Sequence, residues 1–322
     1  MRVTISAPAR LHLGDLDPFA LGRFGYAPVL AITEPRTVIE AEESADGLEV
    51  DGFEKDDAQM YAQRVLDAFD LKGAKVIVKA TAPRNQGFGS TTQLSLTVGR
   101  AVTKAYDLDV PLLELVKALK RTSTGGIYPF QMGGFVVAGG FPVKPGERIW
   151  LREETLIPPL IFRGDFPEEW RFVLARPLVA PKSPDKESEE VAFGTLRDRK
   201  PPAELIHKGY FVLAAKMLPA LLERNAAAFG KALTELQMTV GRIYQPVQEQ
   251  LFNPASQWLI PILNRSGALG IGQSSWGPTV YAFTDSPEAA QRIADTIEAE
   301  ARGKAEVTLV GADNAGARIE TG

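Results

Sequence analysis

A glycine-rich turn between an expected strand and an expected helix limits the fold of this chain more than any other feature. Residues 74–80 are rich in β-branched side chains and predict a strand, and residues 90–106 have the apolar spacing of a helix. The turn between them reads PRNQGFGSTT over residues 83–92. A strand that passes through such a turn into a helix indicates a mixed protein and excludes the all-helical and all-strand classes.

The same turn is a candidate phosphate site. Gly87 and Gly89 let the backbone turn with its amides pointing inward, and the first four amides of the following helix have no partner inside it. Those amides, the helix dipole and the hydroxyls of Ser90, Thr91 and Thr92 together favour an anion. The alternative is an ordinary capped turn with Ser90 or Thr91 as the N-cap. No lysine follows the second glycine, so the turn is not a Walker motif.

Strands and helices are mixed along the rest of the chain, which favours an α+β or α/β class. Pro8 is expected to close the first strand, Asp46-Gly47 to form a hairpin turn, and the proline-rich stretch 144–165 to hold a domain boundary. Placed at 150/151, that boundary gives domains 1–150 and 151–322. Further strands are expected at 3–7, 29–32, 37–41, 170–175, 279–283 and 305–310, with a strand pair within 133–143. Further helices are expected at 56–69, 111–120, 205–222, 225–237, 258–265 and 287–301.

The composition excludes several classes of function. The chain has 322 residues and a formal net charge of −4, so no overall field attracts it to nucleic acid or acidic lipid. It has no cysteine, which excludes disulfides, thiolate metal sites and cysteine nucleophiles. Neither of its two histidines, His12 and His207, has a carboxylate at metal-motif spacing. Without a signal peptide or a run of about 18 uncharged apolar residues, we expect a cytoplasmic protein with no membrane and no nucleic-acid partner.

A second candidate segment, residues 121–127, reads RTSTGGI. The planar guanidinium of Arg121 can bind phosphate or carboxylate through two hydrogen bonds. Ser123, Thr124 and Gly125 follow it, and their hydroxyls and backbone could form another amide nest. The alternative is a helix C-terminus with Lys120 and Arg121 in its last turn and Gly125 beyond it.

A third candidate segment, residues 267–278, reads GALGIGQSSWGP and precedes an expected strand. Trp276 beside flexible backbone can stack on an aromatic ring or close a pocket. Ser274, Ser275 and Gly277 flank it and are candidates for the same site. The alternative is a loop that places Trp276 in the core.

Arg10 and His12 follow the first expected strand and share one face of an extended segment, because they lie two residues apart. Arg10 could bind an anion, and His12 could act as an acid, a base or a hydrogen-bond donor on the same ligand. The alternative is a structural histidine.

Two of these segments occur in the order typical of one superfamily. A turn of the form P-x-x-x-G-x-G-S-[ST] between strand and helix, followed about 180 residues later by a second glycine-rich loop, resembles the GHMP kinase superfamily. The resemblance covers essentially the whole chain. It implies an α+β, two-domain GHMP-kinase-like fold with a ribosomal-protein-S5-domain-2-like N-terminal domain and a ferredoxin-like C-terminal domain.

Three shorter segments resemble one branch, the β-ribofuranosylaminobenzene 5'-phosphate synthase family: residues 9–14 (ARLHLG), 89–94 (GSTTQL) and 274–281 (SSWGPTVY). Enzymes of that branch join phosphoribosyl diphosphate to 4-aminobenzoate or 4-hydroxybenzoate, releasing carbon dioxide and diphosphate, in methanopterin biosynthesis. The chain departs from both patterns in one place. Residues 126–131 (GIYPFQ) lack the aspartate that the kinases carry there, and 124–128 (TGGIY) replace the usual Ser-Gly-Ile-Gly of the synthases.

The resemblance implies roles for the candidate residues. Arg10 or Arg121 would hold the benzoate carboxylate or the 5'-phosphate, and His12 would make a polar contact with the reacting centre. Trp276 would contact the aromatic acceptor. The remaining substrate-binding residues would be Gly87, Gly89, Ser90, Thr91, Thr92, Ser123, Thr124, Gly125, Ser274, Ser275 and Gly277.

The resemblance also implies Mg²⁺ held mainly through the diphosphate, no organic cofactor, small-molecule substrates and a homodimer. Two other functions stay open. An ATP-dependent small-molecule kinase would need a carboxylate from elsewhere in the chain to replace the missing aspartate. A regulator without catalytic activity would keep the anion site as a ligand sensor.

Overall fold

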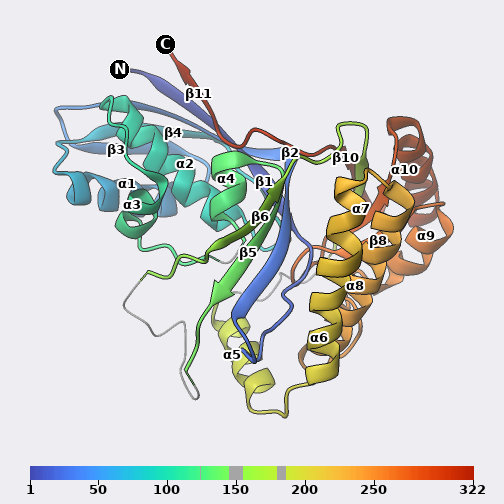
Figure 1. The fold of residues 1–322 in the computed structure, drawn as a ribbon. Coiled ribbons are helices and arrows are strands. Elements are labelled where there is room, and N and C mark those ends of the chain that lie inside the picture. Colours follow the sequence, from blue (N-terminus) through green and yellow to red (C-terminus); the bar gives the residue numbers. More distant parts are fainter. Residues whose placement is uncertain (124, 145–154, 180–185) are drawn as a thin grey trace.

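The computed structural model describes residues 1–123, 125–144, 155–179 and 186–322. The predicted position of the domain boundary, 150/151, lies outside these residues. The described chain forms two sheets with helices packed on their faces (Figure 1). This mixed architecture agrees with the predicted α+β class.

The first sheet has seven strands in the order β11-β1-β2-β4-β3, with β5 paired to β2 and β6 to β5. Its helices pack through a continuous apolar cluster that includes Val65, Leu96 and Leu115. The strands are β1 (Val3–His12), β2 (Phe24–Glu43), β3 (Leu48–Gly52), β4 (Ala74–Ala80), β5 (Phe135–Phe141), β6 (Leu160–Gly164) and β11 (Arg318–Thr321). The helices are α1 (Lys55–Phe69), α2 (Ser90–Ala105), α3 (Leu112–Ala118) and α4 (Ile127–Met132).

The first strand does not end at Pro8, so that prediction is wrong. Strand β1 continues to His12 through a register shift, at which Pro8 lies opposite Arg36 and Ala9 opposite Ile32 of β2. A bulge of this kind tolerates proline, because the ladder is interrupted there. The extension carries Arg10 and His12 into the sheet. The two strands expected at 29–32 and 37–41 are likewise parts of the single strand β2.

Three other predictions about strands are wrong. Asp46-Gly47 does not join a hairpin, because β3 pairs in parallel with β4, which lies between β2 and β3. The turn instead binds the start of β4, where the Ala74 amide donates to the Gly47 carbonyl at 3.1 Å. The stretch 133–143 holds a single strand, β5, and not a pair of strands. Strand β5 pairs with β2 on one side and with β6 on the other. The loop expected at 267–278 contains the strand β8 (Gly270–Gln273).

The second sheet has the strand order β10-β7-β9-β8, with every pair antiparallel. Its strands are β7 (Arg171–Pro177), β8, β9 (Val280–Thr284) and β10 (Ala305–Val310). With α8 and α10 as the two crossovers, the chain order β7-α8-β8-β9-α10-β10 confirms the predicted ferredoxin-like arrangement. The helices of this part are α5 (Lys186–Arg197), α6 (Ala203–Val212), η2 (Leu213–Met217), α7 (Leu218–Leu222), α8 (Ala226–Gln248), η3 (Gln257–Leu259), α9 (Ile260–Arg265) and α10 (Pro287–Ala301).

Helix α8 begins where the sequence indicates and ends later than predicted. Asn225 is its N-cap, and its side chain accepts a hydrogen bond from the Ala228 amide at 3.1 Å. The apolar face continues past Gln237 through Ile243 and Tyr244, which are buried. This continued burial extends the helix by three turns and brings its C-terminal half to the candidate site.

One helical stretch, Ala203–Leu222, is long and apolar enough by length and composition to cross a membrane, with a mean hydropathy of 1.3. It comprises α6, η2 and α7 in succession, and its buried residues Ile206, Val212 and Met217 lie in the core beside α8. Core helices of globular proteins pass the same test, so this stretch is weak evidence for a membrane.

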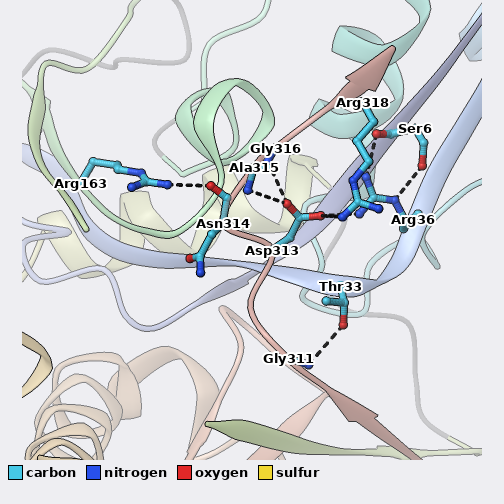
Figure 2. Close-up of polar contacts among 10 residues, drawn as sticks. All are labelled: Ser6, Thr33, Arg36, Arg163, Gly311, Asp313, Asn314, Ala315, Gly316 and Arg318. Atoms are coloured by element: carbon cyan, nitrogen blue, oxygen red, sulfur yellow. Dashed lines mark hydrogen bonds and ion pairs between the residues drawn. The ribbon is translucent and has the colours of Figure 1, made fainter. Parts of the chain in front are cut away.

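Asp313 anchors the chain where it returns from the second sheet to the first (Figure 2). Its side chain is fully buried, and Oδ2 lies 2.5 Å from Arg36 Nη1 and 3.3 Å from Arg318 Nη2. Its Oδ1 accepts hydrogen bonds from the amides of Ala315 at 3.0 Å and Gly316 at 2.8 Å. All acceptor positions of this buried carboxylate are therefore directed at donors, as burial of a charge requires.

The residues around Asp313 extend this connection to residues 163–166 and to Thr33, and Figure 2 shows the contacts of Arg163 and Thr33. The Asn314 side chain exchanges two hydrogen bonds with the Phe166 backbone, both at 2.9 Å, and Arg163 donates to the Asn314 carbonyl at 2.6 Å. The Gly311 amide donates to Thr33 Oγ1 at 3.2 Å. The two sheets are thus joined by specific hydrogen bonds as well as by apolar packing.

Candidate functional site

A cavity of about 470 Å³ lies where the first sheet meets α8 and the loop between β8 and β9. All four segments that the sequence analysis singled out reach it, within residues 10–15, 85–92, 120–123 with 125, and 273–277. The described fold therefore gathers at one place the candidate residues that are far apart in the sequence.

The phosphate loop, residues 87–92, opens helix α2 into this cavity. The N-cap is Gly89, in the left-handed conformation with φ 71°, and no side chain caps the helix. The reading of Ser90 or Thr91 as the N-cap is therefore wrong. Ser90, Thr91 and Thr92 all line the cavity beside the helix N-terminus. The arrangement has the donors and the dipole direction that an anion requires.

The carbonyl of Gly87 fixes the phosphate loop to two other segments. Arg10 Nη1 and Ser274 Oγ each donate a hydrogen bond to it, both at 2.6 Å. Gly87 has φ +90°, and a Cβ placed on it would lie 2.4 Å from the Ser274 carbonyl oxygen. Ser274 is fully buried and does not itself line the cavity. Among the predicted site residues of its loop, it supports the cavity from behind.

Gly87→Ala should therefore disrupt the phosphate loop, and Gly47→Ala is its matched control. Gly47 has a similar φ of +93°, but a Cβ there meets nothing within 4 Å. Gly47→Ala should cost only the backbone strain of about 1–2 kcal/mol in the free energy of unfolding. Gly87→Ala should cost more than that and also weaken phosphate binding, measured by urea unfolding and by calorimetry with diphosphate. Equal losses in the two variants would contradict this account of the loop.

Arg10 and His12 both face the cavity from β1, as their spacing predicts. The backbone of His12 is bound to the C-terminal loop, since its amide donates to Ser274 Oγ and its carbonyl accepts from the Ser275 amide, both at 3.0 Å. Burial, aided by the positive charge of Arg10, lowers the pKa of His12 to about 3. The imidazole is therefore neutral near pH 7 and can exchange hydrogen bonds with a ligand, but it does not supply a proton there.

This shift also predicts a dependence of stability on pH. Because the pKa of His12 is lower in the folded state than its ordinary 6.5, the unfolded chain binds the proton more readily as the pH falls from 6.5 toward 3. Stability that is present above pH 6.5 is thus lost on acidification, by about 1.5 kcal/mol between pH 6.5 and 5.

The loss should disappear in His12→Asn, with the exposed His207→Asn as the matched control. Urea unfolding at several pH values measures it as the difference in slope between the variants. A His12→Asn protein with the same acid sensitivity as His207→Asn would contradict the assignment of a buried, neutral His12.

Arg121 lies beside the phosphate loop, where its Nε and Nη2 both donate to Thr92 Oγ1 at 3.2 Å. Its segment is not the helix end with Gly125 as the cap, because α3 ends at Ala118 and the left-handed residue that follows is Lys120. Gly125 instead lies against the imidazole, where an added Cβ would be 3.0 Å from His12 Cδ2.

Two other predicted residues of this segment have different positions. Ser123 lines the cavity, and its Oγ accepts a hydrogen bond from the Gly126 amide at 3.1 Å. Thr124 lies outside the described residues. Ser123 is therefore part of the cavity lining, and the role of Thr124 stays a prediction.

Trp276 has both of the positions that the sequence left open. It lines the cavity, and it also packs edge-to-face against Tyr244 of α8, with ring centroids 4.9 Å apart, and Phe193 of α5, at 5.7 Å. Phe193 in turn packs edge-to-face against Phe24 at the start of β2, with ring centroids 5.1 Å apart. These four rings form one side of the cavity, and we refer to them as the aromatic wall. Ser275 and Gly277 border Trp276 in the lining.

The sequence analysis missed several residues of the lining. Asp15 is the only carboxylate among the described residues of the cavity, and its position next to Arg10 and His12 was a signal that could have identified it. Tyr244 lies two helical turns beyond the buried Gln237, a signal that required the full length of α8. For Phe24 and Phe193 the sequence offers no signal, since each is an isolated aromatic in a different segment. The additional polar residues of the lining include Asn85, Lys120, Thr122, Gln237, Gln248 and Gln273.

Comparison with known proteins identifies the fold. The family models described as GHMP kinases N terminal domain and GHMP kinases C terminal match residues 58–134 and 217–303. Among solved structures, L. major mevalonate kinase with R-mevalonate superposes with a TM-score of 0.71 at 14% identity, covering 97% of this chain and 96% of the other. Methanococcus jannaschii mevalonate kinase gives a TM-score of 0.69 at 15% identity, covering 97% and 98%. At these identities the likeness is one of fold alone.

Curated relatives place the chain more closely. Two proteins named beta-ribofuranosylphenol 5'-phosphate synthase are 28% identical to it: that of Methanothermobacter thermautotrophicus, over 98% of both chains, and that of Methanocaldococcus jannaschii, over 98% and 99%. A third, from Archaeoglobus fulgidus, is 30% identical over 88% of both chains. They confirm the resemblance to this family that the sequence analysis proposed. The chain belongs to the beta-ribofuranosylphenol 5'-phosphate synthase family, which is built on the GHMP kinase fold.

Proposed function

We propose that this protein transfers the phosphoribosyl group of phosphoribosyl diphosphate to 4-hydroxybenzoate or 4-aminobenzoate with loss of carbon dioxide, in methanopterin biosynthesis. The relatives are named for a ribofuranosylphenol 5'-phosphate, which favours 4-hydroxybenzoate, because that acceptor yields a phenol. The observation that carries the proposal is one cavity in which a cationic, hydroxyl-rich end adjoins an aromatic wall. Such a cavity suits a phosphorylated sugar and a small ring together.

The reaction forms a carbon–carbon bond between the ribose and the ring carbon that bears the carboxylate. The bond from the ribose to diphosphate breaks first or at the same time, so the sugar gains oxocarbenium character and the departing diphosphate takes the electron pair. The bond between the ring carbon and the carboxylate then breaks, carbon dioxide leaves, and the electron pair of that bond stays on the ring and restores aromaticity. The protein's part in this sequence is to hold two substrates in line and to stabilise the charge on the diphosphate.

The cationic end of the cavity suits the phosphates. Arg10, Lys120 and Arg121 line it, together with the amides and hydroxyls of the phosphate loop. Arg10 contacts the Gly87 carbonyl, and Arg121 contacts the Thr92 hydroxyl, so both guanidinium groups are held beside the loop. We assign them to the diphosphate, the 5'-phosphate or the carboxylate of the acceptor. His12, neutral and next to Arg10, is assigned a polar contact with the reacting centre.

We further propose that Mg²⁺ binds mainly through the oxygens of the diphosphate. The residues present fit this mode, since Asp15 and the hydroxyls of Ser90 and Thr91 are oxygen donors that line the cavity. In the described part of the chain, no group of three or more histidine or acidic side chains could hold the ion alone. When bound, the ion would neutralise charge on the diphosphate.

We also expect a cytoplasmic protein that forms a homodimer. Light scattering of the purified protein tests the dimer.

The names of the relatives support this function over an ATP-dependent kinase. The segment 126–131, where the kinases carry an aspartate, comprises the N-cap Gly126 and most of α4, and it contains no carboxylate. Phosphoryl transfer to an alcohol would have to rely on Asp15, the single described carboxylate of the lining.

A carbon dioxide release assay tests the proposal. The protein is incubated with phosphoribosyl diphosphate, Mg²⁺ and carboxyl-labelled 4-hydroxybenzoate, and in parallel with labelled 4-aminobenzoate. We expect labelled carbon dioxide that depends on both substrates. No release with either acceptor would contradict the proposal.

A further inference from the structure

The aromatic wall is formed by four elements that contribute one ring each. Phe24 begins β2, Phe193 lies on α5, Tyr244 on α8 and Trp276 in the loop after β8. All neighbouring pairs meet edge-to-face, with interplanar angles of 72° for Phe24–Phe193, 73° for Phe193–Trp276 and 89° for Tyr244–Trp276. This is the favoured geometry of aromatic pairs, so the rings hold one another in place without a ligand.

Phe193 is the central ring of the wall. It contacts the other three, including Tyr244 at 6.3 Å. It also joins two apolar clusters, one around Tyr244 and the buried Leu196, the other around Phe24. Leu196, three residues later on α5, is fully buried and fixes the helix against α8. The position of Phe193 is therefore set by packing on both sides.

Phe193 is nevertheless not a simple core residue. It is only half-buried, and it lines the same cavity as the phosphate loop. The wall adjoins that loop directly, because Ser274 donates to the Gly87 carbonyl and Trp276 follows two residues later. A partly exposed ring held beside the candidate anion site presents apolar surface to whatever occupies the rest of the cavity.

We propose that Phe193, with Trp276 and Tyr244, forms the subsite for the aromatic ring of the acceptor, and that Phe193 is its specificity-determining residue. This proposal rests on the proposed function for the identity of the acceptor. The subsite takes a single planar ring. The carboxylate of the acceptor then lies toward Arg10 and the phosphate loop. Contact with Phe193 then governs affinity for the acceptor and leaves affinity for phosphoribosyl diphosphate to the cationic end.

The test compares Phe193→Ala and Phe193→Leu with wild type. The control is Phe53→Ala, which removes a largely exposed phenylalanine that does not line the cavity. Calorimetry measures the Kd for 4-hydroxybenzoate with diphosphate and Mg²⁺ present, and the carbon dioxide assay measures KM for each substrate. Phe193→Ala should raise the Kd and KM of the acceptor about tenfold and change the KM of phosphoribosyl diphosphate by less than about twofold. Phe193→Leu, which keeps apolar volume and protects folding, should fall between wild type and Phe193→Ala.

Three results would overturn the subsite: no binding of 4-hydroxybenzoate to wild type, a Kd for Phe193→Ala equal to that of Phe53→Ala, or an equal rise in both KM values. Failure of the proposed function has a different signature. Wild type would then bind 4-hydroxybenzoate, Phe193→Ala would weaken that binding, and no carbon dioxide would be released. That outcome would support the subsite for the ring and contradict the proposed reaction.

Discussion

Arg10→Ala is expected to lower kcat/KM for phosphoribosyl diphosphate by about 10²–10³-fold, the usual effect of removing one donor from a site where negative charge develops. Its guanidinium lies along the phosphate loop, with Nη1 bonded to the Gly87 carbonyl at 2.6 Å and Nε 3.0 Å from where a Cβ on Gly89 would be. The variant therefore loses both a positive charge and a contact that fixes the loop.

One further variant separates these losses, and a second serves as the control. Arg10→Lys keeps the charge but not the planar fork, and should recover only part of the activity. Arg265→Ala removes an exposed arginine that pairs with Glu300 away from the cavity, and should leave the kinetics unchanged. Steady-state carbon dioxide release, with unfolding monitored in parallel, measures both effects. An Arg10→Ala enzyme within a factor of about two of Arg265→Ala would remove Arg10 from the proposed site.

Asp313→Ala should produce the largest loss of stability, about 3–5 kcal/mol in the free energy of unfolding, since it removes one partner of a buried ion pair. The Asp313 side chain is fully buried and holds Arg36 at 2.5 Å, while its backbone amide donates to the Ala31 carbonyl at 3.0 Å. Without the carboxylate, Arg36 keeps only its hydrogen bonds to Ser6, and the amides of Ala315 and Gly316 lose their acceptor.

The control is Glu300→Ala, which breaks an ion pair of similar length whose partners are exposed. That change should cost less than about 1 kcal/mol, because solvent screens the pair. Asp313→Asn retains an acceptor oxygen for the two amides and should lie between the two. Urea unfolding gives the three values, and an Asp313→Ala protein as stable as Glu300→Ala would show that Asp313 does not anchor the returning chain.

Local chemistry made part of this fold predictable. Strand β4, helix α10 and strand β10 have the predicted limits, because their apolar periodicity agrees with their end signals, such as Ser286 and Pro287 at the start of α10. Gly87 and Gly89 have positive φ angles in the phosphate loop, as the turn requires. In each of these cases the determining interactions lie within a few residues.

Pairing between distant segments was not predictable in the same way. The parallel partner of β3 is set by β4 entering the sheet after α1, and β8 becomes a strand only because β9 pairs with it. The candidate site shows the same division. Arg10, Arg121 and the phosphate loop carry recognisable donors, whereas Phe24 and Phe193 become functional candidates only when folding brings them to Trp276.

One incubation separates the two possible activities most directly. The protein is given phosphoribosyl diphosphate, ATP, Mg²⁺ and 4-hydroxybenzoate labelled in the ring, and the products are resolved by mass spectrometry. Membership of the synthase family predicts a ring-labelled ribofuranosylphenol 5'-phosphate with the carboxyl group lost, and ATP left intact. Consumption of ATP to ADP with phosphorylated 4-hydroxybenzoate, and no carbon–carbon product, would contradict it.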